Sequence, residues 1–197
     1  FGCCGFHMPS QNMVNSFKTS AQGLPLFDTY DNTDVLQGND FLTNTFDPRL
    51  DHTVAILGHP YKYKPDFLFA KSWLRAPEVY GNYMSLKEVV APDDPSFKKM
   101  PPFMSSSKNQ DIIRFDDILL YKAEALIELN REGEALPLIN EIRQRAINST
   151  DLLKQADNSY TSNYSMDIYK PGVNCTWTND FARKALQWER KLEFSME

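Results

Sequence analysis

The chain has 197 residues, of which 42% are hydrophobic and 13% aromatic, and this is enough to bury the core of one domain. Its net charge of −5 argues against a surface for nucleic acid or anionic membranes and more easily accommodates an uncharged or cationic partner. Three cysteines without C-x-x-C spacing exclude a disulfide framework and a zinc or redox site of that type. No apolar run approaches the roughly 20 residues of a membrane-spanning helix, and the start of the chain lacks a signal-peptide pattern.

The first part of the chain, residues 1–111, is rich in Pro, Gly, Asn and Asp and predicts long structured loops. A short helix is expected at residues 10–17, because Ser10 can cap it and the apolar residues share one face. Residues 54–57 and 61–64 are candidate strands of a small β-hairpin, and residues 83–90 include a short strand. Prolines between residues 71 and 108 exclude long helices there.

Residues 114–146 predict a helical hairpin. Two apolar rows make the first helix apolar over a wide face, which we expect to be covered on more than one side. Gly133 is the residue expected to take positive φ in the short connection, and Pro137 is expected in the first turn of the second helix. The rows are Phe115, Leu119, Ala123, Leu126 and Ile118, Tyr121, Ala125, Leu129.

The last part of the chain predicts a polar loop followed by a third helix. Residues 148–174 are mainly polar and form an excursion from the helices. Thr178 or Asn179 can then cap a helix whose apolar stripe packs beside the hairpin. The fold class expected is mainly α with long loops, in which residues 112–197 are the helical scaffold. The stripe consists of Phe181, Ala185, Trp188 and Leu192.

Three segments in a fixed order resemble the SusD/RagB family. They are PSQNMVNSF at residues 9–17, DPRLDHT at 47–53, and the hairpin with its NEIRQRA ending followed by WERKLEF at 188–194. The resemblance spans nearly the whole chain and includes Asp47, Pro48, Arg49, Asn140, Arg143, Arg145, Ala146, Glu189, Arg190, Lys191 and Glu193.

This resemblance implies a non-enzymatic lipoprotein at the bacterial cell surface. Such a protein binds an oligosaccharide or another nutrient and works with a TonB-dependent transporter barrel in the outer membrane. It also implies that residues 1–197 are one unit, the C-terminal portion of a larger protein. The lipid anchor would lie outside this chain, so that neither Cys3 nor Cys4 carries it.

The candidate ligand-binding residues are aromatic and polar side chains of the loop-rich part. Aromatic faces pack against the C–H side of a sugar ring, and planar polar groups bind its hydroxyls. Packing of these rings onto the helices is the alternative interpretation for each of them. The candidates are Phe1, Phe6, His7, Trp73, Arg75, Tyr80, Asn82 and Tyr83. A lower-ranked group on the polar excursion is Tyr160, Tyr164, Tyr169 and Trp177.

No metal, cofactor or catalytic residue is predicted. The acidic stretch at residues 28–40 lacks the spacing of an EF-hand loop and is interpreted as a solvated turn, and the three histidines lack zinc spacing. Glu189 and Arg190 are interpreted as an ion-paired helix face with a structural role. Two other functions remain open, which are a tetratricopeptide-like protein-interaction module without a sugar site, and a hydrolase that uses a pair of carboxylates.

Overall fold

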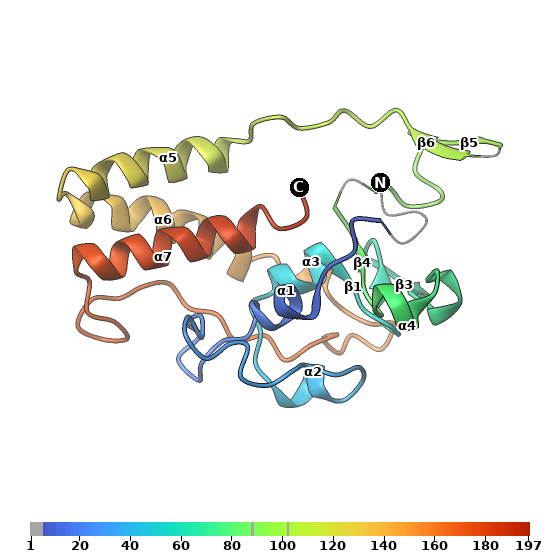
Figure 1. Ribbon diagram of the computed structural model, residues 1–197, viewed down its shortest axis with the longest axis horizontal. Helices are drawn as coiled ribbons and strands as arrows, with labels where there is room; N and C mark the ends of the chain where they lie inside the picture. The colour runs from blue at the N-terminus through green and yellow to red at the C-terminus, as the bar shows by residue number, and fades with distance from the viewer. Residues whose placement is uncertain (1–5, 88, 102) are drawn as a thin grey trace.

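The computed structural model describes residues 6–87, 89–101 and 103–197, and it is mainly helical with long loops, as predicted. Three long helices, α5 (Phe115–Glu128), α6 (Glu132–Ile147) and α7 (Asn179–Glu193), lie side by side at one end (Figure 1). Short elements form the other end, and an extended segment before α5 connects the two (Figure 1). The short helices are α1 (Gln11–Asn15), α2 (Asp40–Thr43), α3 (Arg49–Thr53), α4 (Pro77–Tyr80) and the 3-10 turns η1 (Lys71–Trp73) and η2 (Thr150–Leu152).

The predicted helical hairpin is confirmed as α5 and α6, but its connection differs from the expectation. Asn130, with φ of 56°, takes the left-handed conformation that ends α5, whereas Gly133 lies inside α6. Asparagine tolerates this conformation because its short polar side chain bonds locally. Because α6 begins earlier than expected, at Glu132, Pro137 lies inside the helix and not in its first turn.

Helix α5 is covered on one side only, so the expectation that both apolar rows are covered is wrong for the described residues. Leu120, Ala123 and Ile127 face α6 and α7 and are buried. Ile118 and Leu129, from the second row, are 53% and 64% exposed. The two partner helices reach one face of α5, because each packs against the other as well as against α5.

The described strands form three antiparallel pairs. In the first, β1 (Val54–Ala55) pairs with β4 (Met84–Ser85). The expected pairing of residues 54–57 with residues 61–64 is therefore wrong. A small hairpin does form in this region, but its strands are β2 (Pro60–Tyr61) and β3 (Lys64–Leu68), and residues 62 and 63 are its turn. A third hairpin, β5 (Phe97–Met100) with β6 (Phe103–Ser106), was not predicted, because the prolines around it indicated turns alone.

Local signals place the helix starts as predicted. The Ser10 hydroxyl accepts a bond from Met13 N at 3.1 Å, and Thr178 accepts one from Phe181 N at 3.3 Å.

The polar excursion at residues 148–174 is mostly irregular and is held against α3 by the buried Asp51. Asp51 accepts hydrogen bonds from Ser162 at 2.7 Å and from Tyr164 at 2.8 Å.

A buried ionic network joins the short helix α3 to the long helices. Arg49 lies 2.6 Å from Asp47, 2.9 Å from Glu189 and 3.3 Å from Glu193, measured between charged atoms. Glu189 also pairs with Arg143 of α6. The structural role expected for Glu189 is therefore supported, but the side chain is fully buried and not on a solvated helix face.

Arg143 extends the network to two loops. Its guanidinium donates to the carbonyl oxygens of Gly23 at 3.1 Å and of Asp167 at 2.8 Å, and its side chain is fully buried. It also lies 4.4 Å from the ring centre of Tyr169. Since an unpaired buried charge is very costly, the five donors of one guanidinium fix the positions of an N-terminal loop, the polar excursion and α7 together.

Replacement of Arg143 tests this description. Arg143→Ala leaves Glu189 buried with one partner fewer, so the free energy of unfolding should fall by about 3–5 kcal/mol. Urea denaturation followed by far-UV circular dichroism measures the change. Arg131→Ala is the matched control, because Arg131 pairs with Glu134 on the exposed surface. Equal losses in the two variants would contradict a structural role for the network.

Candidate functional site

One cavity brings three neighbouring predicted ligand residues together with two segments that are distant from them along the chain. It has a volume of about 300 Å³ and is lined by Tyr80, Asn82 and Tyr83 on one side and by residues 9–11 on the other. Residues 35–37 complete its wall. An exposed ring beside an amide, an arrangement that suits a sugar, is present in this cavity through Tyr80 and Asn82, whereas the Gln11 amide already donates to Asn15 and to the Val35 carbonyl, each at 2.9 Å.

Local backbone geometry places these side chains. Ala76 has φ of 46°, a left-handed conformation, immediately before Pro77 begins α4, and Gly81 with φ of 88° ends that helix after one turn. Tyr80 is therefore carried at the end of a short helix and stays 42% exposed. Tyr83 is buried instead, and its hydroxyl donates to the Val35 carbonyl at 3.0 Å, so it supports the wall.

The other predicted ligand residues lie elsewhere. Trp73 packs in a group of rings, with its ring centre 4.9 Å from that of Phe67. Arg75 is exposed and does not line this cavity. Phe6 is exposed, and His7 Nε2 lies 3.2 Å from the Met196 carbonyl. Phe1 lies outside the described residues.

The lower-ranked aromatic group makes mainly structural contacts. The Trp177 indole donates to the Glu132 carbonyl at 2.8 Å, and Tyr169 is buried. Tyr164 binds Asp51, while Tyr160 stays exposed.

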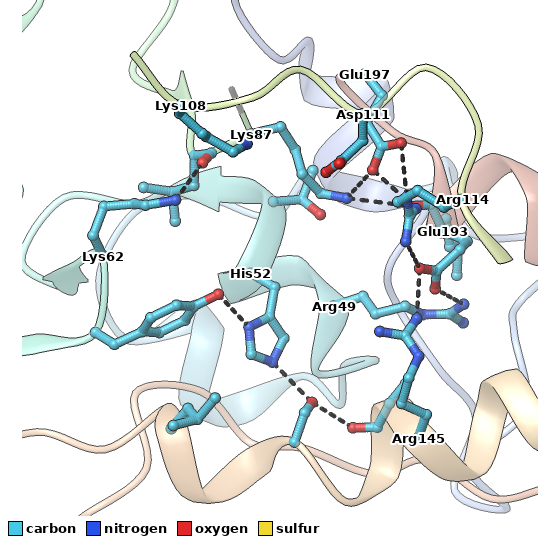
Figure 2. A pocket seen from close by; sticks show the side chains of 17 residues that line it. Arg49, His52, Lys62, Lys87, Lys108, Asp111, Arg114, Arg145, Glu193 and Glu197 are labelled. Atoms are coloured by element: carbon cyan, nitrogen blue, oxygen red, sulfur yellow. Dashed lines mark hydrogen bonds and ion pairs between the residues drawn. The ribbon is translucent and has the colours of Figure 1, made fainter. Parts of the chain in front are cut away.

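A second cavity, of about 370 Å³, was not predicted. It lies between α3, the turn of the β2–β3 hairpin and the C-terminal ends of α6 and α7. Figure 2 shows His52 between Lys62 on one side and Arg145 and Glu193 on the other. The charged residues that line it are Arg49, Lys62, Lys87, Lys108, Asp111, Arg114, Arg145, Glu193 and Glu197.

His52 is held in one tautomer at the floor of this second cavity. The Ser149 hydroxyl donates its only proton to the Ala146 carbonyl at 2.6 Å, so it accepts a hydrogen bond from His52 Nε2 at 2.8 Å. Nδ1 is then the acceptor for the Tyr63 hydroxyl at 2.9 Å. Burial lowers the pKa of His52 to about 4; Asp51 and Asp47 oppose the shift but do not reverse it.

Glu193 organises the wall opposite Lys62. Its carboxylate lies 3.3 Å from Arg49, 3.1 Å from Arg114 and 2.5 Å from Arg145. Burial alone would raise its pKa, but these three guanidinium groups outweigh that effect and lower the pKa to about 2. Glu193 therefore stays ionised and fixes the three arginines around the cavity.

Sequence spacing could not reveal this cavity, because its lining comes from segments between residues 49 and 197 that are distant along the chain. The local signals are the DPR, NEIRQRA and WERKLEF motifs, which contribute Arg49, Arg145, Ala146 and Glu193 to the lining. The overall charge did not indicate a cavity lined by many Lys and Arg side chains either, since the chain as a whole is acidic.

Within the described ranges, no group of three or more His, Cys, Asp or Glu side chains is placed to hold a metal ion. The acidic stretch at residues 28–40 makes local contacts instead. Asp31 accepts hydrogen bonds from Asn12 at 2.7 Å and from Asn15 at 2.8 Å. Among the same residues, no helix combines the length and the hydropathy needed to cross a membrane.

The pKa of His52 predicts a pH dependence of stability. Its folded-state pKa of about 4 lies below the ordinary histidine pKa of 6.5, so its contribution to stability is complete above pH 6.5 and is lost as the pH falls toward 4. Between pH 7 and pH 5 we expect a loss of about 2 kcal/mol from this residue.

Urea denaturation at the two pH values measures this loss, which His52→Gln should remove. His7→Gln, at an exposed histidine, is the control and should keep the pH dependence of the parent protein. An unchanged pH dependence in His52→Gln would contradict the buried neutral imidazole.

Comparison with known proteins gives one result for the whole chain. A search of curated proteins found no match. The model of the SusD family, in contrast, matches residues 1–197. Since that match includes all three segments that suggested the resemblance, together with every residue between them, this chain belongs to the SusD family.

Proposed function

We propose that this protein binds a glycan, or a nutrient of similar chemistry, at the bacterial cell surface and delivers it to a TonB-dependent transporter of the outer membrane. Members of the SusD family bind glycans or other nutrients at the cell surface and are binding proteins, not enzymes. A lipid anchor would hold the protein at the membrane.

The observation that carries the ligand site is the cavity beside Tyr80. Its exposed ring offers an apolar face, while Asn82 offers an amide group for hydroxyls at the same opening. The volume of about 300 Å³ is at the lower end of the range for small-molecule sites, about 300–1,000 Å³. We therefore propose Tyr80 and Asn82 as the ligand residues, with the buried Tyr83 as support for the wall, while Trp73 and Arg75 lie outside the lining.

Substitution of Tyr80 tests the proposed site. Tyr80→Ala removes the stacking surface, and affinity for a neutral oligosaccharide should fall by up to about tenfold, the equivalent of an aromatic contact of about 0.5–1.5 kcal/mol. A glycan array identifies the oligosaccharide, and isothermal titration calorimetry measures its affinity.

Tyr160→Ala is the matched control, because Tyr160 is exposed to a similar extent on the polar excursion. If no member of a broad glycan panel bound the protein, the proposed function would be wrong. Equal losses in both variants would place the ligand away from Tyr80.

A protein-interaction role is the second candidate, and the exposed row on α5 favours it. Ile118, Tyr121 and Leu129 are 53%, 53% and 64% exposed, although the Arg190 guanidinium lies over the Tyr121 ring, 4.6 Å from its centre. Soluble proteins seldom expose such contiguous apolar surface unless it contacts a partner.

Affinity purification of the full-length protein from detergent-solubilised membranes separates the two roles. Delivery to a transporter predicts recovery of an outer-membrane barrel. Recovery of a soluble partner alone, lost in Ile118→Asp, would instead favour the interaction module. Lys122→Asp is the control on the same helix, because Lys122 is already polar and exposed.

A further inference from the structure

We propose that the cavity at Tyr80 selects a sugar that carries an N-acetyl group, and that the Gln37 side chain recognises this group. The inference rests on the proposed glycan-binding function and names a class of ligand for the same site. It starts from an observation that the proposed function does not use, which is a buried amide without a partner in the wall of the cavity.

The Gln37 amide is the first argument. Gln37 lines the cavity, and its side-chain nitrogen and oxygen are both buried without a hydrogen bond to any described residue. A buried polar group without a partner destabilises a protein, and most such groups in native proteins are satisfied. The last torsion of a glutamine side chain is soft, so this amide can turn to a ligand while the backbone stays in place. Gln37 therefore has one donor group and one acceptor available for a ligand.

Neighbouring side chains do not satisfy this amide. Burial raises the pKa of Tyr83, and the amides of Gln11 and Gln37, which lie near its hydroxyl, oppose that rise. The Tyr83 hydroxyl donates its only proton to the Val35 carbonyl at 3.0 Å, so it has none for the Gln37 oxygen. The Gln11 amide donates to Asn15 and to the same carbonyl, each at 2.9 Å. Tyr83 and Gln11 thus bind within the protein, while the Gln37 amide has no partner there.

Exposed aliphatic side chains beside the amide are the second argument. Leu36 and Val79 are 64% and 69% exposed, and both line the same cavity as Tyr80. A pair of sugar hydroxyls would satisfy the Gln37 amide but would leave these side chains in water. An acetamido group presents an N–H and a C=O to the amide and also a methyl group to the aliphatic side chains. The combination therefore favours an acetamido group over a hydroxyl.

The rest of the lining suits an uncharged ligand of this kind. Among the described residues, no charged side chain lines this cavity, so an uncharged sugar binds without the desolvation of an ion. The Tyr80 ring offers its face to the C–H side of the sugar, and the Asn82 amide lies at the same opening. Because the volume of about 300 Å³ is small for a ligand site, we expect it to hold one N-acetylated unit of a longer chain.

Calorimetric titration of the full-length protein with two matched pairs of probes tests the proposal. One pair is chitotetraose and cellotetraose, and the other is N-acetyllactosamine and lactose. Within each pair the backbone and the linkage are the same, and an acetamido group replaces a hydroxyl. In at least one pair we expect the acetamido probe to bind about tenfold more tightly, the equivalent of two hydrogen bonds to an amide.

Substitution of Gln37 locates the recognition. Gln37→Leu replaces the amide by an aliphatic group of similar size, so the preference for the acetamido probe should be lost while the hydroxyl probe binds nearly as before. Since the change removes two buried polar atoms without partners, the urea midpoint of unfolding should not fall. Val79→Ser should reduce the preference by about threefold, because the methyl group loses an apolar contact. Gln22→Leu is the matched control, because Gln22 is exposed and lines neither cavity.

Four results would overturn the proposal. They are the absence of a preference in both pairs, including a failure of all four probes to bind, a preference that survives in Gln37→Leu, an equal loss in Gln22→Leu, and a lower urea midpoint in Gln37→Leu. Failure of the proposed function is a different outcome, in which no member of a broad glycan panel binds. If glycans bind through Tyr80 and acetamido sugars gain nothing, the proposed function stands and this inference alone is wrong.

Discussion

The buried ion pair between Arg143 and Glu189 is the interaction on which the rest of this structure depends. Both side chains are fully buried, and their remaining hydrogen-bonding groups reach Arg49 and the carbonyl groups of two loops. Hydrophobic contacts tolerate small shifts, whereas a buried charge requires partners at defined distances. The network therefore specifies how the short elements of the N-terminal part sit on the three long helices.

The same network forms part of a ligand-accessible wall. Arg49 pairs with the buried Glu189 and also lines the second cavity, the one at His52. Glu193, one turn further along α7, likewise pairs with Arg49 and lines the same cavity. Residues that stabilise the fold thus hold the partly buried Arg114 and the exposed Arg145 in place. This arrangement reduces the conformational entropy that two long side chains would lose on binding a ligand.

The two cavities differ in how they are built. Tyr80 stands at the end of a single helical turn that begins with a left-handed alanine, and its cavity is lined by amides and rings. The cavity at His52 depends instead on contacts between residues far apart in the sequence, such as His52 with Ser149. Membership of the SusD family is consistent with a nutrient-binding surface.

The sequence by itself determined α1, the three long helices and the N-caps of α1 and α7, because helical periodicity and capping are local properties that Ser10, Thr178 and the stripes of α5 and α7 display directly. The order of the motifs also identified the family. Only the tertiary structure decided that β1 pairs with β4, that one face of α5 is covered, and that Lys62 and Arg145 share a cavity. These features depend on contacts between distant residues, whose partners no local pattern encodes.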